Sequence, residues 1–226
     1  MTALVTGASR GIGRATALEL ARRKEPLALL GRPSDGLEDT ARRARDAGVR
    51  VETVPCDLGN SREVSDAANR VLEAFGAPIA VVHNAAVIHR APIEEMTDAE
   101  WDEQIDVNLR GPFLLTRALL TAMRRAGKGR IVHVSSISGT LGTRSASAYC
   151  ASKWGLIGFM KSLAEEISGS GLMTVALLPG SVETRMLEGS GFSPRMTAED
   201  VAKTVAHFAL DAPVAHNGGV VEMFGT

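Results

Sequence analysis

Residues 6–13 read Thr-Gly-Ala-Ser-Arg-Gly-Ile-Gly and carry glycines in a G-x-x-x-G-x-G spacing. This segment follows a short apolar run and opens the helical pattern of residues 12–23. Glycine permits a tight turn and a close backbone approach to a phosphate, and the free amides at a helix start favour negative charge. Three glycines alone also occur in ordinary turns, but their position between strand and helix predicts a dinucleotide-binding loop. Its predicted members are Gly7, Ser9, Arg10, Gly11, Ile12 and Gly13.

Short apolar runs alternate with longer amphipathic stretches along the rest of the chain. Helical spacing is clear in residues 61–75, where apolar side chains recur at three- and four-residue steps. Such alternation predicts an α/β fold, a doubly wound and seven-stranded parallel sheet with helices on both faces, whose ligands bind at the carboxyl ends of the strands. With 226 residues, a single domain over 1–226 is expected. The seven predicted strands are residues 2–6, 26–31, 49–55, 78–83, 130–135, 172–178 and 219–224.

The composition excludes several classes of protein. Hydrophobic residues make up 45% of the chain and charged residues 23%, which is typical of a globular domain and not of a disordered one. The 25 basic and 26 acidic residues give a net charge of −1, which argues against nucleic acid as a partner. No apolar stretch is long enough for a membrane span, and no secretory leader is recognisable, so a cytoplasmic protein without a membrane partner is expected. Neither the two cysteines nor the five histidines have the spacing of a metal site, so no metal is predicted.

The end of the second predicted strand bears on the choice of dinucleotide. An acidic side chain there binds the ribose of NAD, whereas a cation accommodates the additional phosphate of NADP. Position 31 is a glycine, and Arg32 follows it. Together with Arg10, this arginine is expected to bind a 2′-phosphate, so NADP(H) is favoured over NAD(H). Solvated surface arginines are the alternative interpretation, and Asp35 is the nearest acid that would oppose the choice.

Tyr149 and Lys153 are spaced i, i+4 in the segment Tyr-Cys-Ala-Ser-Lys, which places both side chains on one face of a helix. A phenol ordinarily titrates near ~10, and an adjacent ammonium is expected to lower its pKa towards the range useful for acid–base catalysis. The same spacing also arises by chance, with tyrosine packing in the core and lysine reaching solvent.

A serine-rich segment follows the fifth predicted strand, at the end where ligands are expected. Ser135, Ser136 and Ser138 each offer a hydroxyl that can bind a substrate carbonyl, and turn formation is the alternative role. Their positions alone do not select one of the three.

Asn108 lies inside a helical pattern that Gly111 and Pro112 perturb. A polar residue at such a break can use its amide for backbone groups or a water molecule instead of the helix. Asn108 is therefore a further candidate site residue.

Five landmarks appear in order: Thr-Gly-Ala-Ser-Arg-Gly-Ile-Gly at 6–13, Cys-Asp-Leu at 56–58, His-Asn-Ala-Ala at 83–86, the Ser-Ser pair with the Tyr-Cys-Ala-Ser-Lys segment, and Pro-Gly-Ser-Val-Glu-Thr at 179–184. Over essentially the whole chain, the sequence resembles the compact, single-domain branch of the short-chain dehydrogenase/reductase family. The resemblance implies a Rossmann-type NAD(P)-binding domain, a small-molecule carbonyl or alcohol substrate, and a homodimer or homotetramer.

The resemblance also implies roles for individual residues. Tyr149 would be the proton donor, and Ser136 would bind the carbonyl because it lies thirteen residues before the tyrosine, as in the family. Lys153 would assist the tyrosine and hold the nicotinamide ribose, and Asn108 would hold a water molecule. The remaining cofactor contacts would be Asp57 and Leu58 at the adenine, Asn84 and Ala85 at the middle of the dinucleotide, and Val182 and Thr184 at the nicotinamide amide.

Two features depart from the family pattern. His83 and Ala86 stand where asparagine and glycine are usual. Residues 185–196, expected to be a short mobile substrate loop, form a shorter segment than in many relatives. The sequence predicts an NADPH-dependent carbonyl reductase, with an NAD-dependent alcohol dehydrogenase or a non-catalytic dinucleotide-binding scaffold as the alternatives.

Overall fold

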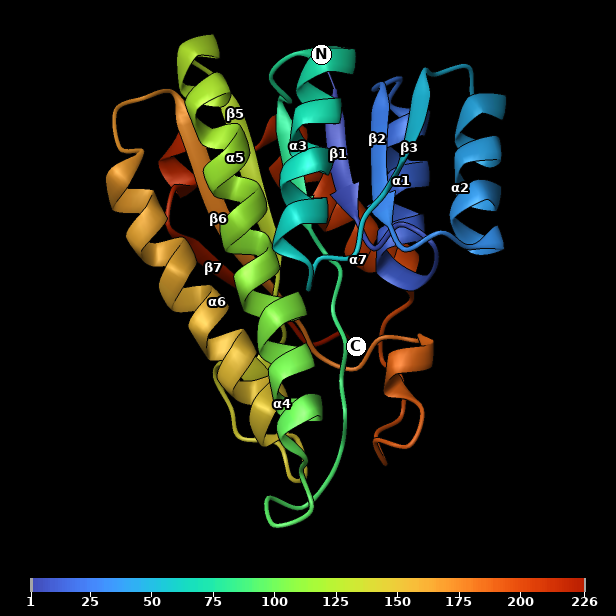
Figure 1. Cartoon of the computed structure of the whole chain (residues 1–226), viewed down its shortest axis with the longest axis vertical. Helices are drawn as coiled ribbons and strands as arrows, with labels where there is room; N and C mark the ends of the chain where they lie inside the picture. The colour runs from blue at the N-terminus through green and yellow to red at the C-terminus, as the bar shows by residue number, and fades with distance from the viewer. Residues whose placement is uncertain (1, 226) are drawn as a thin grey trace.

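Seven parallel strands form one sheet in the computed structural model, which describes residues 2–225 (Figure 1). Their order is β3-β2-β1-β4-β5-β6-β7, so the chain starts inside the sheet, builds outward to β3 and then crosses to β4. This confirms the predicted fold class, and strand ends differ from the predicted ones by one or two residues. The strands are β1 (Ala3–Thr6), β2 (Leu27–Gly31), β3 (Val51–Pro55), β4 (Ala80–His83), β5 (Gly129–Val134), β6 (Leu172–Pro179) and β7 (Gly219–Met223).

Helices cover both faces of the sheet. On one face, α1 (Gly11–Arg22), α2 (Asp35–Asp46) and α7 (Ala198–Ala206) enclose one hydrophobic core with the strands. On the other, α3 (Ser61–Phe75), α5 (Gly111–Ala126) and α6 (Ser147–Glu166) enclose a second core. In the described part of the chain, every helix is too short or too polar to cross a membrane.

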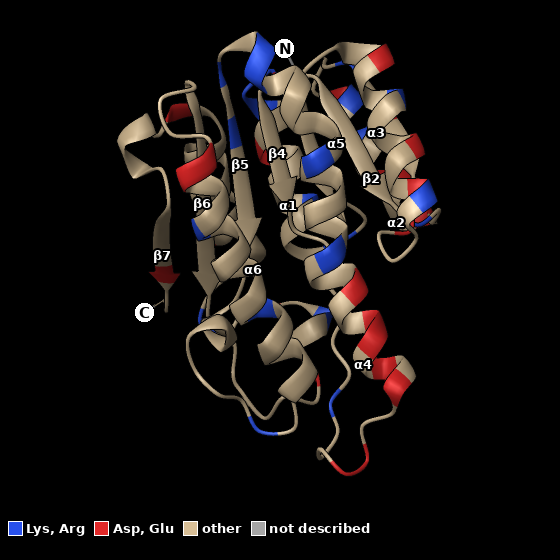
Figure 2. Ribbon diagram, turned by 60° about the vertical axis from the view of Figure 1, so that its left-hand side comes forward, with Lys and Arg blue, Asp and Glu red and all other residues tan. Residues whose placement is uncertain are grey.

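One helical column extends beyond the sheet. Helix α4 (Asp98–Ile105) continues through a π-helical turn, η1 (Asp106–Arg110), into α5, and acidic side chains gather on α4 (Figure 2). Pro112 has no N–H, so the carbonyl of Asn108 lacks the donor that an α-helix would supply four residues later. Gly111 packs so tightly that a Cβ atom there would lie 2.8 Å from the carbonyl oxygen of Leu58. The predicted perturbation is therefore a wider turn within a continuous helix.

Two histidines face each other in the middle of the sheet. His83 of β4 and His133 of β5 are register partners, and their rings stack with centroids 5.0 Å apart. Their Nε2 atoms hydrogen-bond the hydroxyls of Thr116 (2.9 Å) and Thr174 (3.1 Å). Both Nδ1 atoms are buried without a hydrogen-bond partner among residues 2–225. Burial lowers the pKa of His83 to about 3 and that of His133 well below its usual range, so both rings are neutral at pH 7.

Candidate active site

The glycine turn between β1 and α1 is shaped by close backbone contacts. Gly7 and Gly11 have φ angles of +68° and +54°, which side chains rarely adopt. A Cβ atom on Gly7 would lie 2.8 Å from the Cα of Ala85, and one on Gly11 would lie 3.2 Å from the methyl group of Thr184. A Cβ on Gly13 would collide with the carbonyl of Gly7. The glycines thus bring the turn against the β4 and β6 loops and leave a cradle without side chains.

Helix α1 presents its first amides at this turn. Its N-cap is Arg10, which makes no side-chain cap, whereas the N-caps of α2, α3, α4 and α7 all have one. The unpaired amides and the helix dipole are suited to an anion. The cradle and this helix end together fit the diphosphate of a dinucleotide, which the predicted residues from Gly7 to Gly13 would hold.

Two residues that the sequence analysis missed hold the turn in place. Thr6 Oγ1 accepts hydrogen bonds from the backbone amides of Asn84 (3.0 Å) and Ala85 (3.1 Å). Arg14 donates to the carbonyl of Ser9 (2.6 Å) and to that of Gly36 (3.1 Å), which ties the turn to α2. Thr6 begins the glycine motif and Arg14 directly follows it, but Asn84, Ala85 and Gly36 are distant in the sequence, so the motif alone did not indicate these contacts. Asn84 also donates to the carbonyl of Thr6 (3.0 Å), which holds its side chain against the turn. Its contact with the middle of the dinucleotide stays a prediction.

The predicted adenosine end is open and cationic. Arg10 and Arg32 are exposed, and neither takes part in an ion pair within residues 2–225. Asp35 lies in the first turn of α2, where the helix dipole favours its charge. Asp57 uses its carboxylate to accept from the amide of Gly59 (3.0 Å), and Leu58 is buried beside it.

Tyr149 and Lys153 emerge from one face of α6 and are nearly covered, with 7% and 2% of their surfaces exposed. The Lys153 Nζ donates to the carbonyl of Val134 (3.0 Å) at the end of β5 and lies 5.5 Å from the centroid of the Tyr149 ring. The Tyr149 hydroxyl donates to the thioether sulfur of Met186, 3.9 Å away. The structure therefore brings the predicted pair together at the carboxyl edge of the sheet, beside the glycine turn.

The expected lowering of the Tyr149 pKa by Lys153 is wrong in this structure. Burial dominates and raises the pKa of Tyr149 to about 12, against the opposing effects of a hydrogen bond from Ser136 and the charge of Arg90. The ammonium group of Lys153 is directed to the Val134 carbonyl, and burial lowers the pKa of Lys153 itself to about 8. Tyr149 therefore keeps its proton at neutral pH, as a proton donor requires.

The three candidate serines have different partners. Ser136 interacts with the Tyr149 phenol and accepts a hydrogen bond from the Ser138 amide (3.1 Å), which orients its hydroxyl. Ser135 is turned into the protein and donates to the carbonyl of Lys153 (3.3 Å). Ser138 shares a hydrogen bond with Thr143 (2.9 Å). Ser136 is thus the serine positioned with the tyrosine.

Replacing Ser136 by alanine is expected to reduce turnover by about 10²–10³-fold, the usual effect of removing one hydrogen-bond donor to a developing oxyanion. Steady-state kinetics of carbonyl reduction would measure the loss. Ser138→Ala is the matched control, because it removes only the contact with Thr143. Equal losses in the two variants would contradict the assignment.

Asn108 is buried, and its side chain connects two segments of the site. Its amide accepts from the Val87 N–H (2.8 Å) and donates to the Val87 carbonyl (2.9 Å) and to Ser152 (3.1 Å). These bonds hold the loop after β4 against α6. The Asn108 side chain therefore binds protein groups. Its backbone carbonyl has no helical donor, because Pro112 lacks an N–H, and is the group left to bind a water molecule.

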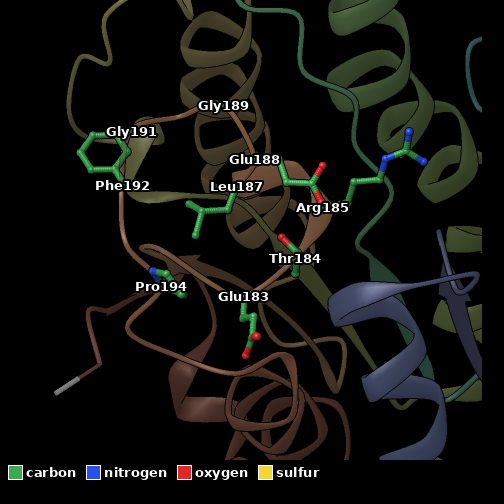
Figure 3. A pocket seen from close by; sticks show the side chains of 9 residues that line it. All are labelled: Glu183, Thr184, Arg185, Leu187, Glu188, Gly189, Gly191, Phe192 and Pro194. Carbon is green, nitrogen blue, oxygen red and sulfur yellow. The ribbon is translucent and has the colours of Figure 1, made fainter.

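Residues 185–196 form a loop that extends beyond the sheet. A 3₁₀ turn covers Arg185–Leu187, and a parallel bridge between Val182 and Met196 joins the two ends of the loop. Beside it lies a cavity of about 520 Å³ (Figure 3). The figure shows the Arg185 side chain extending away from Phe192, on the other side of the loop. The mobility of this loop stays a prediction.

Comparison with known proteins identifies the family. The model for the short chain dehydrogenase family matches residues 1–191. A 3-oxoacyl-(acyl-carrier-protein) reductase of Pseudomonas aeruginosa is 31% identical over 235 residues, which cover 99% of this chain and 95% of that protein. A crystal structure of a metagenomic short-chain oxidoreductase in complex with NADP has a TM-score of 0.88 and 36% identity, covering 100% of this chain and 97% of that one. Levodione reductase has a TM-score of 0.92 at 30% identity, covering 98% and 95%.

The chain therefore belongs to the short-chain dehydrogenase/reductase family of oxidoreductases. The solved relative with bound NADP supports a nicotinamide dinucleotide as the cofactor. The glycine cradle and the uncapped start of α1 agree with this, because both suit a diphosphate.

Proposed function

We propose that the protein reduces the carbonyl group of a small ketone or aldehyde with NADPH, acting in the cytoplasm. The observation that carries this proposal is a tyrosine buried beside a lysine and a serine, on the same edge of the sheet as the glycine cradle. Some similar proteins are named as reductases and others as dehydrogenases, so the direction of reaction is proposed from the site alone. A phenol with a raised pKa keeps its proton at neutral pH, which suits the donation of a proton to a carbonyl oxygen.

Each residue of the site has a separate role in the proposed reduction. A bound nicotinamide supplies the hydride. The hydroxyls of Ser136 and Tyr149 hold the carbonyl oxygen, and the Tyr149 proton passes to that oxygen as negative charge develops there. The Lys153 ammonium stabilises the phenolate that remains. The carbonyl of Asn108 holds a water molecule through which a proton returns to the lysine and tyrosine.

The experiment for this proposal is a panel of ketones and aldehydes offered with NADPH or NADH, followed by the loss of absorbance of the reduced nicotinamide. Reduction of at least one ketone or aldehyde, faster with NADPH, is expected. Absence of turnover across the panel would contradict the function and favour a binding scaffold.

NADPH is expected to bind more tightly than NADH, because Arg10 and Arg32 are exposed cations that form no ion pair with any of residues 2–225, and position 31 carries no acid. Arg32→Asp should shrink or reverse this preference, and each tenfold change corresponds to about 1.4 kcal/mol. Fluorescence titration with the two nucleotides would measure it. Equal affinities in the unchanged protein would refute the choice of NADPH.

A homodimer or homotetramer is proposed from the outer surfaces of α5 and α6. Phe113 and Trp154 are exposed there to 40% and 54%, which is costly for a face that stays in water. Light scattering after gel filtration would determine the oligomeric state, and Trp154→Glu should weaken the assembly.

A further inference from the structure

Met186 links the catalytic phenol to a cation. Its thioether sulfur accepts the hydrogen bond of the Tyr149 hydroxyl (3.9 Å), and its backbone carbonyl accepts one from the Arg90 guanidinium (3.0 Å). A carbonyl substrate must itself accept the hydrogen bond of Tyr149, within about 2.6–3.2 Å. Productive binding therefore moves the Met186 side chain off the phenol.

Arg90 is exposed on the loop after β4, and none of the ion pairs in the described part of the chain involves it. Glu103 binds the ring of His89 (2.6 Å) and Glu100 caps α4, and within residues 2–225 the exposed Glu94 and Glu95 form no ion pair with Arg90 either. The Arg90 charge also acts on Tyr149. A neutral backbone carbonyl is a weak partner for a guanidinium, which binds carboxylates through stronger, charge-assisted and often paired hydrogen bonds.

We propose, on the basis of the proposed carbonyl reduction, that the substrate is a keto acid or aldehyde acid whose carboxylate replaces the Met186 carbonyl on Arg90. The substrate carbonyl then occupies the place of the Met186 sulfur at Tyr149. This assigns Arg90 as the residue that determines specificity for an anionic substrate.

The covalent structure of Met186 gives the spacing of the two substrate groups. About five bonds separate its carbonyl oxygen from its sulfur, as many as separate the ketone oxygen from a carboxylate oxygen in a 4-oxo acid. The contact to sulfur is longer than a bond to a carbonyl oxygen, which leaves room for one more methylene. The preferred substrates are thus 4-oxo and 5-oxo acids, rather than 2-oxo acids.

The test compares 4-oxopentanoate and 5-oxohexanoate with their methyl esters, which keep the ketone and lose the charge. We expect the unchanged enzyme to prefer each acid by at least about tenfold in kcat/KM. Arg90→Gln should lower kcat/KM for the acids by about 10–100-fold, mainly through KM, and change that for the esters little. Arg90→Lys should restore part of the preference. Arg125→Gln, at the far end of α5, changes the net charge equally and is the control.

Esters reduced as well as acids, or equal losses for both in Arg90→Gln, would overturn the assignment of Arg90 while leaving carbonyl reduction intact. A preference for a phosphate ester of the same length would overturn the choice of carboxylate. A second readout is independent of turnover: calorimetry should detect pentanoate but not pentanamide binding to the unchanged protein, and no pentanoate binding to Arg90→Gln. Should no ketone or aldehyde be reduced, the proposed function fails, and calorimetry still decides whether Arg90 binds carboxylates.

Discussion

Replacement of Tyr149 by phenylalanine is expected to remove nearly all carbonyl reduction, by a factor of about 10²–10⁴, and to leave dinucleotide binding largely intact. The substitution deletes one hydroxyl, which contacts Ser136 and the sulfur of Met186, and keeps the ring that packs on α6. Because the hydroxyl carries the transferable proton, its loss acts on kcat more than on KM. Single-turnover kinetics with preformed enzyme–NADPH complex would measure it.

The neighbouring Cys150→Ser is the control, since its sulfur makes only a long contact with the Leu141 carbonyl (4.0 Å). Lys153→Ala should lower both turnover and dinucleotide affinity, which distinguishes it from the phenylalanine variant. More than a few per cent of residual activity in Tyr149→Phe would show that another group donates the proton.

A large loss of stability in mild acid is expected from the stacked histidines. An imidazole titrates near ~6.5 when the chain is unfolded, whereas the pKa of folded His83 is about 3 and that of His133 is also well lowered. As the pH falls, these two histidines therefore bind protons in the unfolded chain at a higher pH than in the folded chain. The contribution of the two neutral histidines to the free energy of unfolding is fully present above pH ~6.5. Below that pH it is lost progressively, down to the folded pKa values, by up to about 1.4 kcal/mol per pH unit for each histidine.

Urea denaturation between pH 4.5 and 6.5 isolates this effect. Carboxylates with lowered pKa values, such as Glu19 and Asp200, change the free energy of unfolding mainly below their ordinary pKa values of 4.5 and 3.8. His83→Asn, which retains a polar partner for Thr116, should reduce the slope of unfolding free energy against pH by about half. The exposed His216→Asn is the control. An unchanged slope in His83→Asn would show that the pair does not govern acid stability.

The sheet could be predicted from the sequence because its strands are short apolar runs that are buried on both sides. Every residue of β1 and of β6 is buried, and the runs at 2–6 and 172–178 have no charge to interrupt them. The wider turn around Asn108 was signalled by Pro112, whose missing N–H is a property of one residue. Such features depend on local sequence alone.

The site could be located from the sequence but its electrostatics could not. The i, i+4 spacing placed Tyr149 and Lys153 on one helix face, yet the raised pKa of Tyr149 follows from burial of the phenol, whose hydroxyl contacts Met186 on a distant loop. The stacking of His83 and His133 depends on the register of β4 against β5, and the hydrogen bond from Arg14 to the Gly36 carbonyl depends on how α1 packs against α2. These contacts join segments that are distant in the sequence, so the sequence of one segment does not predict them.

The strand order has a consequence for synthesis on the ribosome. β1 pairs with β2 on one side, where Ala3 meets Leu27, and with β4 on the other, where Ala3 meets Ala80. The nascent chain can therefore complete one side of β1 early, while the other edge remains unpaired until β4 has left the exit tunnel. An open edge is a template for pairing with other chains. A pause in translation between α3 and β4 would prolong that exposure, so this stretch of the message is where slow elongation most favours aggregation and where a chaperone would protect the nascent chain.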